Sequence, residues 1–343
     1  MPISELDGRI LHGLQAGIPL CSRPFAALGQ RWGLAESEVI DRIELFRQQG
    51  IVRRVGGVFN AVQFGYQSAL CGIAIPANQI DSVVATLVPH PGITHCYTRS
   101  ARSDGSVEPI CIQEKIPVPN LWFTLSVPSS EFAKQVEQLQ ANIPYPIRVA
   151  PATHRFKVQV VLDPSALGNP EKSGIPEEIP LQGTEIVTPN SWEKCLLRFV
   201  QKEIPLVPEP WQAIATTIGA SEELVLRTLG NWQQIGALRR IALLARHQKM
   251  GFQSNAMCTW DIPKERVETS GLLLAGRREI THCYERSTFP GFPYNVFAMI
   301  HSDTESSIRN LAHHLSELIA QPLGLLFVSV QEYKKTSLVL FSE

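Results

Sequence analysis

The sequence predicts an α+β fold that consists of one two-part unit followed by a second copy of the same unit. The first observation is an internal repeat, in which Ile18-Pro19-Leu20 recurs as Ile204-Pro205-Leu206 and Thr94-His95-Cys96-Tyr97 recurs as Thr281-His282-Cys283-Tyr284. The second observation is that each copy begins with helical spacing of its apolar residues, and the third is that it then alternates strand and helix patterns. An ordered repeat of this kind indicates a tandem duplication.

The first part of each copy is expected to be a winged helix-turn-helix unit. In copy one, short helices are predicted at 5–15, 25–32 and 37–49, the last with apolar residues at helical spacing. Gly50 ends this third helix, and the stretch 51–59 is predicted to be the strand of the wing. Copy two repeats the pattern, with Gly236 in the place of Gly50.

The second part of each copy is expected to be a ferredoxin-like sandwich. In copy two, strands are predicted at 254–262, 280–286, 294–301 and 324–333, with helices at 263–275 and 304–319. The order βαββαβ describes this fold. Each such sheet has an open face, so the two halves are expected to pair within one chain, and a further homo-oligomer is left open.

A stretch rich in Pro, Gly and Glu separates the copies and is expected to be an extended linker. The predicted boundaries are therefore 1–60 for the first winged unit and 61–163 for the first ferredoxin-like unit. The linker takes 164–190. The second winged unit is placed at 191–246 and the second ferredoxin-like unit at 247–343.

Charge and cysteine content argue against several classes of protein. The net charge is −1, whereas DNA binding draws most of its affinity from cationic side chains. The seven cysteines include no Cys-x-x-Cys pair, which favours free thiols in a reducing cytoplasm over a zinc site. No stretch approaches the roughly 20 apolar residues of a membrane span, and the N-terminus does not read as a signal peptide. We therefore expect a cytoplasmic protein with no nucleic-acid or membrane partner.

Several motifs together resemble a known family. Copy one reads Arg53-Arg54-Val55-Gly56-Gly57-Val58-Phe59 and then Gly65-Tyr66-Gln67-Ser68. Copy two reads Arg246-His247-Gln248-Lys249-Met250-Gly251-Phe252 and later Met299-Ile300-His301. Winged units followed by βαββαβ resemble the Lrp/AsnC family, and these motifs are similar to its siroheme decarboxylase branch, the NirD/NirL and AhbA/AhbB proteins, here fused. Gln248 departs from the pattern, because the family usually has an arginine there.

The resemblance implies a non-oxidative decarboxylation of two acetate side chains of siroheme to give 12,18-didecarboxysiroheme, in haem d1 or alternative haem biosynthesis. The substrate brings its own iron, so no cofactor and no metal site of the protein are expected. Such chemistry requires a general acid, cations that hold carboxylates and flat apolar walls.

Copy two supplies these groups and is expected to build most of the site. His247 and His282 are the predicted catalytic residues, one delivering a proton and the other contacting a carboxylate or the iron. The predicted substrate-binding residues are cations, aromatic side chains and a methionine, completed by two residues of copy one: Arg240, Arg246, Lys249, Met257, Trp260, Tyr284, Arg286, His95 and Arg99. For Trp260, a place in the core is an equal alternative.

Two other functions remain open at this point. The winged units are typical of DNA-binding regulators, although acidic residues outnumber arginines in the candidate recognition helices at 37–49 and 221–234. A tetrapyrrole-binding sensor without turnover is the other alternative. A binding assay with DNA tests the first, and an activity assay separates the enzyme from the second.

Overall fold

A computed structural model describes residues 3–103, 117–158, 161 and 185–341 of the chain. The two winged units have matching elements. Copy one contains α1 (Glu5–Ala16), α2 (Pro24–Trp32), α3 (Glu36–Gln48) and β1 (Val52–Phe59), and copy two contains α7 (Ser191–Lys202), α8 (Pro210–Ile218), α9 (Glu222–Gln234) and β6 (Leu238–Ala245). The caps repeat as well, because Gly33 and Gly219 both end their helices in the left-handed conformation, with φ of 69°.

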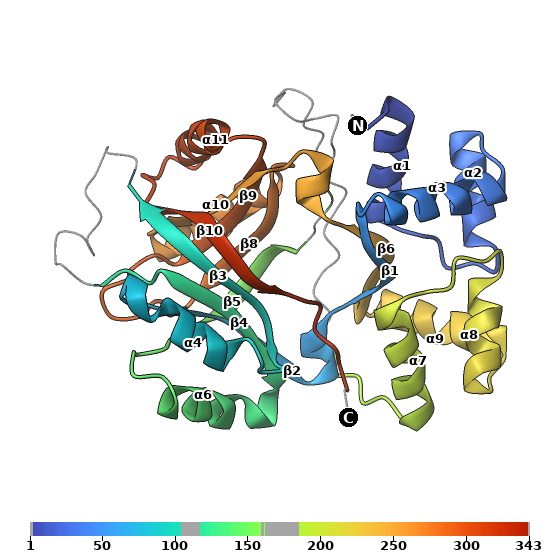
Figure 1. Ribbon diagram of the computed structural model, residues 1–343, viewed down its shortest axis with the longest axis horizontal. Helices are drawn as coiled ribbons and strands as arrows, with labels where there is room; N and C mark the ends of the chain where they lie inside the picture. The colour runs from blue at the N-terminus through green and yellow to red at the C-terminus, as the bar shows by residue number, and fades with distance from the viewer. Residues whose placement is uncertain (1–2, 104–116, 159–160, 162–184, 342–343) are drawn as a thin grey trace.

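The two wings pair with each other. Strands β1 and β6 form a two-stranded antiparallel sheet, in which Val52 lies opposite Ala245 and Phe59 opposite Leu238. The helices of both winged units gather on one side of this sheet and share a single apolar core with it (Figure 1). The sequence predicted each wing but not their pairing.

The ferredoxin-like units follow the predicted βαββαβ order in both copies. Copy one contains β2 (Tyr66–Ile73), α4 (Ile80–Leu87), β3 (Ile93–Arg102), β4 (Leu121–Pro128), α6 (Phe132–Ala141) and β5 (Arg148–Val158). Copy two contains β7 (Ser254–Trp260), α10 (Val267–Ala275), β8 (Ile280–Arg286), β9 (Val296–Ser302), α11 (Glu305–Leu318) and β10 (Leu325–Lys335). The predicted fold class, a tandem duplication of a winged unit and a ferredoxin-like unit, is confirmed.

The eight strands of the two halves close into one antiparallel barrel of order β10-β3-β4-β2-β5-β8-β9-β7. Two seams join the copies, β5 with β8 and β10 with β3. The predicted pairing of the halves within the chain is therefore confirmed. It is achieved by joining strand edges, so the barrel has no unpaired edge.

Strand alternation separates the barrel's inner face from its outer face. Outward-facing side chains such as Cys96 and Cys283 pack beneath the helices in two separate cores, one for each copy. A third, mainly aromatic cluster lies on the inner face and includes Trp122, Phe297 and Phe327. Among the described residues, no helix is long and apolar enough to span a membrane.

Candidate active site

Strand β8 presents a histidine, a tyrosine and an arginine on the inner face of the barrel. Cys283 belongs to the outer core, so His282, Tyr284 and Arg286 point the other way. The rings of His282 and Tyr284 stack with centroids 6.1 Å apart, and the Arg286 guanidinium lies 4.6 Å from the Tyr284 centroid. This is the shared face that the sequence predicted.

Strand β3 of copy one repeats the arrangement. His95 stacks on Tyr97 at 6.2 Å, and the Arg99 guanidinium lies 5.3 Å from the Tyr97 centroid. Arg99 also donates from Nη1 to the Phe327 carbonyl across the β10 seam, at 3.3 Å. Duplication and barrel closure thus bring two equivalent His-x-Tyr-x-Arg faces into one structure.

The wing strands add arginines beside these faces. Arg53 of β1 interacts electrostatically with Tyr97, and Arg239 of β6 interacts in the same way with Tyr284. Arg240 also acts on His282 and donates from Nε to the carbonyl of Gln15 at 3.0 Å. The wing sheet therefore supplies one set of cations to each histidine.

Both histidines are held neutral. Burial, followed by the charges of Arg239 and Arg286, lowers the pKa of His282 to about 4. Burial, followed by the charge of Lys335, lowers the pKa of His95 to about 3. His282 is one of the groups whose charge lowers the pKa of His95, so the His282 ring lies close enough for its charge to act on the His95 ring.

We call the cations that act on these two histidines the cationic cluster: Arg53, Arg99 and Lys335 on His95, and Lys157, Arg239, Arg240 and Arg286 on His282. Burial lowers the pKa of both Arg99 and Arg286 to about 10, so both remain charged at neutral pH. Within the described part of the chain, none of the cluster's arginines forms an ion pair with a carboxylate. The buried Nε atoms of Arg53 and Arg286 also find no hydrogen-bond acceptor there. An anionic ligand would supply both the opposite charge and the hydrogen-bond acceptors that these arginines lack.

The remaining predicted site residues lie in three different places. Met257 is buried in the inner cluster of the barrel. Arg246 and Lys249 are exposed at the connection between wing and barrel, where Arg246 donates to the carbonyls of Gly50 and Val52. Trp260 has no exposed surface and lies in the outer core, with its indole nitrogen donating to Ser316 at 2.9 Å. The structure thus gives Trp260 a packing role, which was the alternative left open for it.

His247 begins the short 3-10 helix η6 (His247–Met250), but its side chain lies outside the described residues. Its predicted catalytic role stays a prediction. Sequence reasoning did not include Tyr97, Arg53, Arg239 and Lys335 among the site residues. The repeat could have identified Tyr97, because it stands between His95 and Arg99 as Tyr284 stands between His282 and Arg286.

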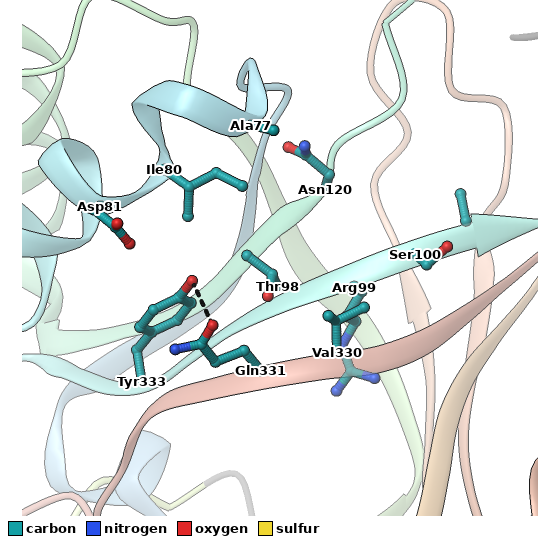
Figure 2. Close-up of a pocket in the computed structure, with 11 residues that line it drawn as sticks. Ala77, Ile80, Asp81, Thr98, Arg99, Ser100, Asn120, Val330, Gln331 and Tyr333 are labelled. Carbon is teal, nitrogen blue, oxygen red and sulfur yellow. Dashed lines mark hydrogen bonds between the residues drawn. The ribbon is translucent and has the colours of Figure 1, made fainter.

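A cavity of about 560 Å³ lies elsewhere, between α4 and strands β3 and β10. Its lining includes Asp81, Thr98, Gln331 and Tyr333. In Figure 2 the guanidinium of Arg99 lies on the opposite side of the strands from Ile80 and Asp81. Arg99 is the one cation among the lining residues, and its guanidinium lies over the Tyr97 ring, away from Asp81. A cavity with a carboxylate and no further cation is unsuited to a polyanion, so we place the candidate site at the cationic cluster.

Comparison with known proteins agrees with this architecture. The family model described as "Siroheme decarboxylase NirDL-like HTH domain" matches residues 7–53 and 193–239, and "AsnC-like ligand binding domain" matches 63–157 and 249–334. A siroheme decarboxylase of Hydrogenobacter thermophilus is 31% identical, over 99% of this chain and 96% of the relative. The chain belongs to the siroheme decarboxylase family.

Two further members of the family relate to the duplication and to the site. The siroheme decarboxylase beta subunit of Methanosarcina barkeri is 41% identical over 42% of this chain and 95% of its own length. A single copy of the unit thus exists as a separate subunit in that relative. A crystal structure of the siroheme decarboxylase NirDL in complex with an iron-uroporphyrin III analogue matches with a TM-score of 0.70 at 28% identity, covering 99% of this chain and 95% of the other.

Proposed function

We propose that this protein decarboxylates two acetate side chains of siroheme to give 12,18-didecarboxysiroheme, and that the cationic cluster holds the substrate. The observation that carries the proposal is a set of buried and half-buried arginines around two neutral histidines, none of them paired with a carboxylate in the described part of the chain. Buried charges without partners are costly, so such a set is expected where an anionic ligand completes it. Siroheme carries eight carboxylates, which suits a site with many cations.

The reaction exchanges one carboxylate for one proton at each acetate. The bond between the methylene carbon and the carboxylate carbon breaks, and carbon dioxide leaves. The electron pair stays on the methylene carbon, in conjugation with the pyrrole, until a proton converts it into a methyl group. The chain must therefore hold the carboxylates in place and deliver a proton.

The described residues divide these tasks between them. Arg286 and Arg99 bind substrate carboxylates, because guanidinium groups pair with carboxylates bidentately. The rings of Tyr284 and Tyr97 stack against the guanidinium groups of Arg286 and Arg99, and they give the site flat walls. His282 delivers the proton from Nε2, since its Nδ1 is already bonded to Thr281 at 3.1 Å. His247 keeps its predicted role as the second catalytic histidine.

No separate cofactor enters this proposal, because the iron arrives with the substrate. Among the described residues no group of three or more histidine, cysteine, aspartate or glutamate side chains could hold a metal ion. We place the reaction in the cytoplasm, and the six cysteines that the structure describes, all of them free, fit such a reducing compartment.

The test is anaerobic incubation of the full chain with siroheme, followed by mass analysis of the tetrapyrrole. The expected product has lost two carbon dioxide units. The matched control is His314→Ala, an exposed histidine on α11, which should react as the wild type does. Tight binding of siroheme without any loss of carbon dioxide would reject the enzyme in favour of a sensor.

A further inference from the structure

Thr281 connects the proposed proton donor to a second histidine. Its Oγ1 lies 3.1 Å from Nδ1 of His282 and 3.1 Å from Nε2 of His301. Thr281 has no exposed surface, so water does not compete for these contacts. The three side chains form a His–hydroxyl–His chain between strands β8 and β9 that leads to the candidate site.

Copy one lacks the far end of this chain. His95 contacts Thr94 Oγ1 through Nδ1 at 2.9 Å, as His282 contacts Thr281. Leu125 and Ile300 hold equivalent positions, opposite Ala69 and Ala256, so the residue after each is equivalent too. That residue is Ser126 in copy one and His301 in copy two. The Ser126 hydroxyl bonds to Ser68, at 2.6 Å.

The hydrogen count of a hydroxyl limits what the chain can do. Thr281 has one hydrogen to donate and lone pairs that accept. Its possible acceptors are Nδ1 of His282, at 3.1 Å, and the Met299 carbonyl, at 3.5 Å. When Nε2 of His301 donates to Oγ1, the Thr281 hydrogen can point at the nearer of the two, Nδ1 of His282. The hydrogen of neutral His282 then resides on Nε2, which bonds to no residue in the described part of the chain. In the described part of copy one, His95 is the only histidine that contacts Thr94, so this order is not imposed on His95.

From this geometry we infer that Thr281 and His301 are positioning residues, which hold the hydrogen of His282 on Nε2, the nitrogen that bonds to no residue in the described part of the chain. The inference rests on the proposed function, because it takes His282 as the proton donor. Nε2 gives its proton to the methylene carbon, and solvent restores the proton on Nε2 once the product has left. In net terms, one proton passes from solvent to the new methyl group.

The need for a fixed tautomer follows from the surroundings of His282. Burial, followed by the charges of Arg239 and Arg286, lowers its pKa to about 4, so the ring is neutral near pH 7 and carries a single hydrogen. That hydrogen can reach the substrate only from the nitrogen that faces the site, so its place on the ring matters for turnover.

Two variants and two matched controls test the inference in the full-length chain. Thr281→Val keeps the shape of the side chain and removes the hydroxyl, and Thr94→Val makes the same change in copy one. His301→Leu removes the nitrogen that donates to Thr281, and Ser126→Ala is its counterpart. The first readout is the ring-nitrogen spectrum of nitrogen-15-labelled histidines without substrate, which distinguishes Nε2–H from Nδ1–H. The wild type should show Nε2–H at His282, and Thr281→Val and His301→Leu should lose that preference.

The second readout is turnover of siroheme. Thr281→Val and His301→Leu should lower kcat roughly 10–100-fold with KM unchanged, as is usual for groups that orient a reacting histidine. Thr281→Ser should restore most of the loss, and both copy-one controls should keep wild-type kcat. If Thr281→Val does not fold, Thr281→Ser and His301→Leu still decide the matter.

Three results would overturn the inference: Nδ1–H at His282 in the wild type, an unchanged tautomer in both copy-two variants, or an equal loss of kcat in Thr94→Val. A wild type that does not decarboxylate siroheme would reject the proposed function instead. The tautomer comparison is made without siroheme, so the two failures can be told apart.

Discussion

At the scale of single residues, the site depends on how charge is arranged around two equivalent histidines. His95 and His282 have the same neighbours in sequence and the same bond to a threonine. Their surroundings differ, because Lys335 and Arg53 act on His95, whereas Arg239 and Arg240 act on His282. A duplicated motif has thus been placed in two different electrostatic environments.

Replacing each of these histidines separately should reveal unequal roles. We expect His282→Ala to lower turnover by roughly 10²–10⁴-fold, the range for a lost general acid, and His95→Ala to cost much less. Both side chains face the site and are only partly buried, so both variants should fold, which circular dichroism checks. If folded His282→Ala keeps more than about a tenth of wild-type turnover, its role as the proton donor is wrong.

The lowered histidine pKa values also predict how stability depends on pH. The pKa of His282 falls from 6.5 in the unfolded chain to about 4 in the folded protein. Between these values the unfolded chain binds a proton that the folded protein does not. The free energy of unfolding should therefore decrease as the pH falls through this window, by about 1.4 kcal/mol for each unit of pKa shift, and His282 should have no effect above it.

Urea unfolding at about pH 7 and about pH 5 measures this effect. His282→Gln, which does not titrate, should lose less stability between the two conditions than the wild type does. His314→Ala is the control, because this exposed side chain should leave the pH dependence unchanged. Equal losses in wild type and His282→Gln would contradict a His282 that is neutral in the folded protein.

Strand alternation explains which site residues could be predicted from the sequence. His282, Tyr284 and Arg286 are spaced by two, so they share a face, as predicted. Met257 and Trp260 are spaced by three and lie on opposite faces of β7, one in the inner cluster and the other in the outer core. They could not both be walls of one site. The sequence could not predict that Arg53 and Arg239 lie beside the histidines, because their position depends on the contact between the wings and the barrel.

At the scale of elements, the winged units retain the helices of a DNA-binding unit without its charge. Arg42 of α3 is paired with Asp7, and Arg47 is paired with Glu44 and Glu203 at 2.7 Å each. The arginines of this helix are thus already neutralised by carboxylates. The wing strands, in turn, direct arginines toward the two histidine faces.

We therefore expect no specific DNA binding. Affinity for DNA comes largely from cations that neutralise phosphates, and α3 has none to spare. Fluorescence polarisation with a mixed pool of duplexes at low and physiological salt tests this. Any weak signal should vanish as salt rises. Sequence-selective binding that survives physiological salt at sub-micromolar protein would show that the winged units still recognise DNA.

At the scale of the whole molecule, the duplication is what closes the barrel. Each copy alone has the strand order of a ferredoxin-like sheet, with β3 and β5 at the edges of copy one and β8 and β10 at those of copy two. The two seams pair all four of these edge strands, β3 with β10 and β5 with β8. Periodicity predicted the strands of each copy, because it is a local property. The seams and the pairing of the wings join segments far apart in sequence, so periodicity did not indicate them.

This architecture predicts that the two halves will reassemble when the chain is divided within the expected linker. Copy one (1–163) and copy two (191–343), expressed together, should form a one-to-one complex, because each half alone leaves two strand edges unpaired. The wing sheet and its shared core should add to the association. Size-exclusion chromatography with light scattering measures the stoichiometry, and siroheme turnover shows whether the site has re-formed. Each half expressed alone should aggregate or self-associate and should lack turnover, because the cationic cluster takes arginines from both copies. A half that is monomeric and active by itself would show that the barrel is not needed to build the site.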